Sequence, residues 1–129
     1  MEHKLNRIHT KSMTVNNEIQ HSVVSEQEIV FNGKTFKEQK EYTSKSGRCM
    51  LIRTRSIDKR FYHVIKSMVN GKLEDEETIE TNMDEDQVSS FKEEWIGAWI
   101  PGWQDDFENV HAMTTILIDY VEFFRQLNF

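Results

Sequence analysis

The chain has 129 residues, of which 37% are apolar and 29% charged, with 16 Lys and Arg against 22 Asp and Glu. This length suits one domain with one modest core and excludes a cofactor domain joined to a separate substrate domain. No stretch approaches the ~18 consecutive apolar residues of a membrane-spanning helix, and the N-terminus lacks the apolar segment of a signal peptide. We therefore expect a single domain over 1–129, no membrane contact and a cytoplasmic location.

The first two thirds of the chain predict extended structure. Short alternating and β-branched runs fill residues 8–83 without a sustained helical period. The dipeptides at 32–33 and 70–71 are both Asn-Gly, which tolerates the positive φ angles of a type I′ hairpin turn, and 44–47 reads as a third turn. Short turns place sequential strands side by side, so this region predicts an antiparallel β-meander of hairpins.

The pattern changes to a helical period after residue 83. Asp84 and Gln87 have the spacing of a capping box, and the apolar residues that follow recur at intervals of three and four up to Pro101. These are Val88, Phe91, Trp95 and Trp99. A second amphipathic helix is expected over 106–127, packing on the first helix or on another protein. The predicted fold is α+β, with the meander followed by two C-terminal α-helices within 84–129.

Charge is distributed very unevenly along the chain. Residues 1–66 hold 13 Lys and Arg against 7 Asp and Glu, whereas residues 67–129 hold 3 against 15. This asymmetry indicates that the two halves contact each other or that each meets an oppositely charged partner. The basic segment 48–60 is accordingly either the internal partner of the acidic run 74–77 or a site for an acidic client or for the acidic surface of a polymer. Nucleic acid is an unlikely partner, because glutamates interrupt the basic half.

No residue pattern nominates an active site. The five histidines are scattered, Cys49 is alone, and the spacing of the acidic residues differs from that of a calcium-binding loop. Phosphate-binding glycine loops and the nucleophile elbow are also missing from the sequence. We therefore expect no catalytic, cofactor-binding or metal-binding residues, no cofactor and no enzymatic activity.

The order of several short segments resembles another group of proteins. They are 34–38 (KTFKE), 58–66 (DKRFYHVIK), 74–77 (EDEE), 82–85 (NMDE) and 91–95 (FKEEW). Over roughly residues 8–96, their order and spacing are similar to the central domain of the myeloid leukemia factor family. Residues 97–129 have no counterpart in that pattern. The Arg-Ser-x-Ser-x-Pro site for 14-3-3 proteins is missing too, because Arg55-Ser56 is followed by Ile57-Asp58.

The resemblance implies a non-enzymatic adaptor of cytoplasm and nucleus that binds Hsp70, J-domain and BAG co-chaperones. An alternative is a structural component of a large cytoskeletal or ciliary (axonemal) assembly. In either case we expect the strands of 53–65 and the helix around 91–95 to supply a protein-binding surface, extended by the later aromatic residues. The predicted contact residues are Arg53, Arg55, Arg60, Tyr62, Val64, Ile65, Phe91, Glu94, Trp95, Trp99, Trp103 and Phe124.

Overall fold

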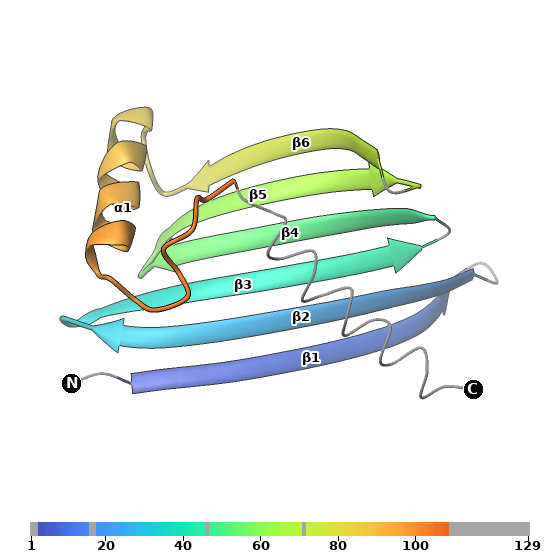
Figure 1. Ribbon diagram of the computed structural model, residues 1–129, viewed down its shortest axis with the longest axis horizontal. Helices are drawn as coiled ribbons and strands as arrows, with labels where there is room; N and C mark the ends of the chain where they lie inside the picture. Colours follow the sequence, from blue (N-terminus) through green and yellow to red (C-terminus); the bar gives the residue numbers. More distant parts are fainter. Residues whose placement is uncertain (1–2, 16–17, 46, 71, 109–129) are drawn as a thin grey trace.

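The computed structural model describes residues 3–15, 18–45, 47–70 and 72–108. Six strands form one sheet in which each strand pairs antiparallel with the next along the chain (Figure 1). They are β1 (His3–Val15), β2 (Glu18–Phe31), β3 (Lys34–Lys45), β4 (Arg48–Ile57), β5 (Arg60–Val69) and β6 (Lys72–Thr81). The predicted meander is therefore confirmed, and it begins five residues earlier than expected.

Turn residues with positive φ angles set the hairpins. Asn32 and Gly33 have φ angles of 51° and 75°, as a type I′ turn requires. Asp58 has a φ angle of 54° in the turn between β4 and β5, which the sequence analysis did not predict. There its carboxylate accepts a hydrogen bond from the Thr35 N–H at 3.0 Å, which joins this turn to the β2–β3 hairpin.

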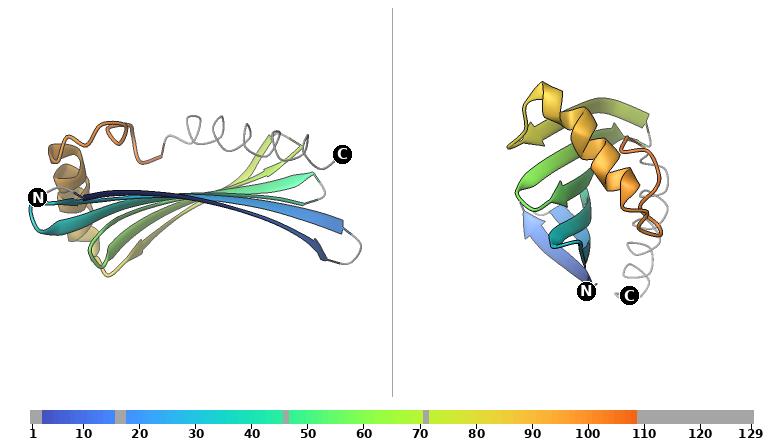
Figure 2. Two further views of the ribbon diagram at one scale, coloured as in Figure 1. Left: turned by 90° about the horizontal axis from the view of Figure 1, so that it is seen from below. Right: turned by 90° about the vertical axis from the view of Figure 1, so that its left-hand side faces the viewer.

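In the described part of the chain one helix follows the sheet, α1 (Glu85–Gly97), and it crosses one end of a single sheet face (Figures 1 and 2). The side chain of Gln87 accepts a hydrogen bond from the N–H of Asp84 at 2.9 Å, as the predicted capping box requires. Residues 98–108 then turn back over the same face. We name residues 98–108 the return loop.

The end of α1 differs from the prediction. The helix stops at Gly97, about one turn before Pro101, and Trp99 adopts a left-handed φ of 51° just beyond the C-cap, Ala98. Trp99 therefore does not share the helical face of Phe91 and Trp95, and Ile100 is buried instead. The second predicted helix, 106–127, lies almost wholly outside the described residues. Its first three residues, 106–108, are described, and they form an irregular turn.

Trp95 is the centre of the core. Its side chain is completely buried, and its ring stacks on that of Trp103 with 4.9 Å between centroids. The rings of Phe36 from β3 and Phe107 from the return loop lie at 5.9 and 6.0 Å. The indole N–H donates to the backbone oxygen of Trp103 at 2.9 Å, so its polar atom is satisfied as well. Trp95 therefore joins the sheet, α1 and the return loop.

Substitution Trp95→Ala is expected to lower the free energy of unfolding by about 4 kcal/mol, because it removes a fully buried ring and leaves a cavity. Urea unfolding followed by circular dichroism measures this change. Leu73→Ala on β6, where the side chain is 54% exposed, is the control and should stay within about 0.5 kcal/mol of the parent chain. Equal losses for both substitutions contradict the central place of Trp95.

Candidate functional site

A buried cluster of charges connects the sheet to the return loop. Alternation along β4 places Arg53 and Arg55 on the covered face, where each side chain is at most 2% exposed. Glu38 of β3 accepts from the Arg55 Nε at 2.8 Å, and Asp105 accepts from Arg53 and Arg55 at 2.5 and 2.6 Å. We name these four residues, Glu38, Arg53, Arg55 and Asp105, the arginine cluster.

The backbone of the return loop adds to this contact. The oxygen of Asp105 accepts from Arg55 and that of Asp106 from Arg53, both at 3.0 Å. The Arg55 guanidinium also lies 5.0 Å from the ring centre of Trp95 and 4.6 Å from that of Phe107, in cation–π contact with both. The cluster therefore fixes the path of the return loop across the sheet.

Electrostatics favour the ionised form of Asp105. Burial raises the pKa of this carboxyl, but the hydrogen bond and charge of Arg53 and the charge of Arg55 outweigh burial and hold the pKa below its ordinary value. Nearby, burial likewise opposes ionisation of Glu108, yet hydrogen bonds led by that from Tyr62, at 2.6 Å, lower its pKa to about 2. Both groups are ionised at neutral pH and act as anchors of the return loop.

A shallow hollow of about 320 Å³ opens beside the C-terminal end of α1, next to the β2–β3 hairpin. Its apolar lining comes from Phe31, Phe36 and Ala98, and Asn32, Lys34, Glu94 and Gly97 complete it. Lys34 and Arg60 both pair with Glu94, whose pKa burial raises but these two cations lower below its usual value. The hollow thus has an apolar lining with an ion pair among its walls.

Trp99 follows directly on this lining in the sequence, and its side chain is 76% exposed. Its backbone is well held: the Trp99 N–H donates to the oxygen of Ile96 at 3.1 Å, and neighbouring Ile100 is buried. The indole N–H of Trp103 donates to Gln27 of β2 at 2.9 Å. A rigid turn therefore presents an indole to solvent. The hollow and Trp99 together are named the Trp99 surface.

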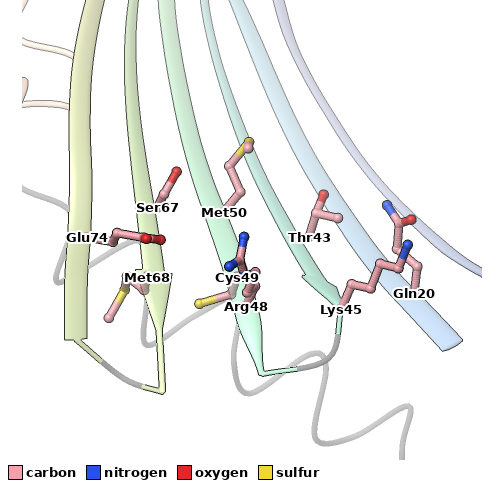
Figure 3. A pocket seen from close by; sticks show the side chains of 9 residues that line it. All are labelled: Gln20, Thr43, Lys45, Arg48, Cys49, Met50, Ser67, Met68 and Glu74. Carbon is pink, nitrogen blue, oxygen red and sulfur yellow. The ribbon is translucent and has the colours of Figure 1, made fainter. Parts of the chain in front are cut away.

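A second hollow, of about 330 Å³, lies at the opposite end of the sheet (Figure 3). Lys45 and Arg48 are paired across the β3–β4 turn on its wall, with the carboxylate of Glu74 and the sulfur atoms of Cys49 and Met50. Two cations and one carboxylate line this hollow, so its lining keeps a net charge of only +1.

Most of the predicted contact residues lie in the interior. The buried ones are Arg53, Arg55, Tyr62, Val64, Phe91, Trp95 and Trp103. Their burial corrects the expectation that they face a partner: the arginines meet internal carboxylates, and the aromatic rings pack on one another where the sheet, α1 and the return loop meet. Arg60, Ile65 and Glu94 are partly exposed, Trp99 is exposed, and Phe124 lies outside the described residues.

The pairing of opposite charges is also more specific than predicted. Within the described residues, the basic segment 48–60 forms ion pairs with Glu38, Glu94 and Asp105. An ion pair of the acidic run 74–77 joins Lys66 of β5 to Glu76, with 3.6 Å between Nζ and Oε1. The sequence analysis missed Asp105 and the hollow's lining residues Phe31 and Phe36. Asp105 belongs to an acidic pair, Asp105-Asp106, that begins two residues after the buried Trp103. This pattern was the available sequence signal for Asp105.

Other kinds of site find little support in the described part of the chain. No group of three or more His, Cys, Asp or Glu side chains there could hold a metal ion. None of its helices has the length and apolarity to cross a bilayer. Comparison of the chain with protein-family models, with curated proteins and with solved structures gave no match.

Substitution Asp105→Asn is expected to lower the free energy of unfolding by about 3 kcal/mol, because it leaves two buried guanidinium groups short of a countercharge. Chemical unfolding at neutral pH measures the loss. Glu93→Gln on the exposed side of α1 removes the same charge and is the control, with an expected change below about 0.5 kcal/mol. If both variants unfold alike, the arginine cluster does not hold the loop.

Acid is expected to destabilise the protein. The folded-state pKa values of Asp105, Glu94 and Glu108 are depressed, so the unfolded chain binds more protons as the pH falls. The stabilisation should be complete above about pH 5 and decrease between about pH 4 and pH 2. Urea unfolding across this range should give a shallower slope for Glu108→Gln than for the parent chain, whereas Glu93→Gln should keep the parent slope. Equal slopes in all three contradict the assignment.

Proposed function

We propose that this chain is a non-enzymatic protein-binding module and that the Trp99 surface is its contact site. The observation that carries the proposal is that Trp99 combines an exposed side chain with a left-handed backbone conformation. Among the described residues, four other non-glycine residues have a positive φ, and Asn32, Asp58, Asn70 and Asn82 are all of types that tolerate this region. A bulky residue there costs stability on the order of 1 kcal/mol.

The position of Trp99 adds to this argument. It occupies the place directly after the helix C-cap, where glycine is the usual residue. Glycine or asparagine there would end the helix with less strain and would expose less apolar area. Strain of this kind is concentrated at functional sites, and tryptophan is the residue type most enriched at the energetic centres of protein interfaces.

The hollow beside Trp99 supports an extended or helical peptide as ligand. An apolar side chain of the partner would enter between Phe31, Phe36 and Ala98, and polar groups of the partner would meet Lys34 and Glu94 at its wall. The partner then covers the indole of Trp99, so that this ring is buried in the complex and exposed in the free chain.

Within this class, we propose an adaptor similar to the myeloid leukemia factors, working in cytoplasm or nucleus with Hsp70, J-domain or BAG co-chaperones. Its support is the order of the segments 34–38, 58–66 and 91–95, two of which contribute to the Trp99 surface through Lys34, Phe36 and Glu94. The second candidate is a component of a cytoskeletal or ciliary assembly. It is favoured by β6, an edge strand whose ten residues are all exposed.

Substitution Trp99→Asn is expected to abolish partner binding while leaving the protein as stable as the parent chain or more so. Asparagine keeps the left-handed turn without the strain and removes the indole. The measurement is capture of purified Hsp70, J-domain and BAG proteins on the immobilised full chain, with urea unfolding of each variant alongside.

Two controls separate binding from folding. Trp99→Phe keeps an aromatic contact and should retain part of the binding, and Leu73→Ala removes exposed apolar area on β6 and should retain all of it. Failure of the parent chain to capture any of the three protein classes overturns the co-chaperone assignment. Capture that is insensitive to Trp99→Asn overturns the Trp99 surface as the contact site.

A further inference from the structure

The two outer strands of the sheet carry opposite charge. Among the described strands, β1 and β6 are the edges, and each has one side of its backbone unpaired by a neighbouring strand. The segment His3–Val15 contains Lys4, Arg7 and Lys11 and no acidic residue. The segment Lys72–Thr81 contains five acidic residues and one lysine, and all ten residues are exposed.

From this arrangement we propose that copies of this chain associate edge to edge, with β6 of one copy pairing with β1 of the next to continue the sheet. Exposed edges are templates for strand addition, and like charges on an edge oppose pairing with an identical edge. Here β6 repels β6 and β1 repels β1, whereas β6 attracts β1. The charge pattern therefore selects one head-to-tail contact between copies.

The even number of strands makes this contact geometrically simple. Sequential strands alternate in direction, so β1 and β6 of one chain run in opposite directions. A second copy can therefore be placed beside β6 without being turned over, and its β1 forms an antiparallel pair with β6. The sheet face that α1 and the return loop cover (Figure 2) therefore stays on the same side in both copies.

A register exists that matches charges and faces together. Opposite charges meet in two places when Glu80 lies opposite Lys4 and Glu77 opposite Arg7, because both pairs are three residues apart in the sequence. Existing strand pairing links Glu80 through β5, β4, β3 and β2 to Asn6, which is two residues from Lys4. Residues two apart share a face, so this register keeps the covered and uncovered faces continuous.

The same register supports the contact beyond its ion pairs. It places Ile79, which is 39% exposed, opposite Leu5, and Asp75 opposite His9. A head-to-tail contact uses two different surfaces and leaves a free β1 and a free β6 at the ends. Association therefore continues past the dimer and yields an open, twisted series of copies. This inference concerns the sheet edges and is independent of the Trp99 surface.

The test is sedimentation velocity of the full chain over a range of concentrations, with folding of each variant checked by circular dichroism. The parent chain should form species larger than dimers at about 0.1 M salt and dissociate at about 1 M, where the screening length falls from ~10 to ~3 Å. Reversal of the acidic edge, Glu77→Lys with Glu80→Lys, should weaken association about tenfold or more. Reversal of the basic edge, Lys4→Glu with Arg7→Glu, should do the same.

The decisive variant combines both reversals, which exchanges the signs of the edges and should restore association to within about threefold of the parent. Glu85→Lys with Glu93→Lys on α1 makes the same change in net charge as the acidic-edge reversal and should associate like the parent, as should Trp99→Asn. A parent chain that stays monomeric, association that strengthens at high salt, or a combined variant that fails to recover each overturns the proposal.

Discussion

The buried guanidinium groups of Arg53 and Arg55 determine where the chain runs after α1. A charge removed from water is tolerated only beside a countercharge and satisfied hydrogen-bond partners. Glu38 supplies one countercharge from within the sheet, and the other, Asp105, must come from the chain beyond α1. The need of the two arginines for this second countercharge therefore favours a path of the return loop across the sheet. On that path, Trp103 and Phe107 make their aromatic contacts. The ion pairs thus determine the direction of the return loop, and its aromatic rings provide most of the apolar area that it buries.

The same contacts explain why a strained tryptophan can persist at the surface. Trp99 lies between Trp95 and Trp103, two residues anchored in the core by stacking and by hydrogen bonds of their indole groups. With both sides fixed, the turn between them has little freedom to relax into a less strained conformation. Stability provided by the core thus maintains a strained conformation, which under the proposed function places Trp99 for contact with a partner.

Local features of the fold were predictable from sequence, and long-range partners were not. The Asn-Gly turn at 32–33 and the Gln87 cap depend on residues a few positions apart, so their chemistry is visible in the sequence. Arg53 and Arg55 look like surface residues on a strand, because arginine is rarely buried without a partner and the partner Asp105 lies fifty residues away. Similarly, an aromatic residue at helical spacing predicts a longer helix, whereas the helix ends before Trp99 and Ile100 is buried in the core in its place. The candidate surface was therefore only partly predictable: Trp99 and Glu94 were identified, whereas its lining by Phe31 and Phe36 depends on tertiary packing.

The order of these elements along the chain affects how the protein is made. Neighbouring strands are joined by short turns, so the sheet is built from contacts of low contact order and can form early during synthesis. The hydrogen bond between Trp103 and Gln27 spans 76 positions, and Asp105 emerges from the ribosome after every strand is complete. Until then, a nascent sheet displays Leu51, Val64 and two arginines that share one countercharge, Glu38, on one side. Synthesis of residues 98–108 therefore both covers this side and supplies the second countercharge of its arginines.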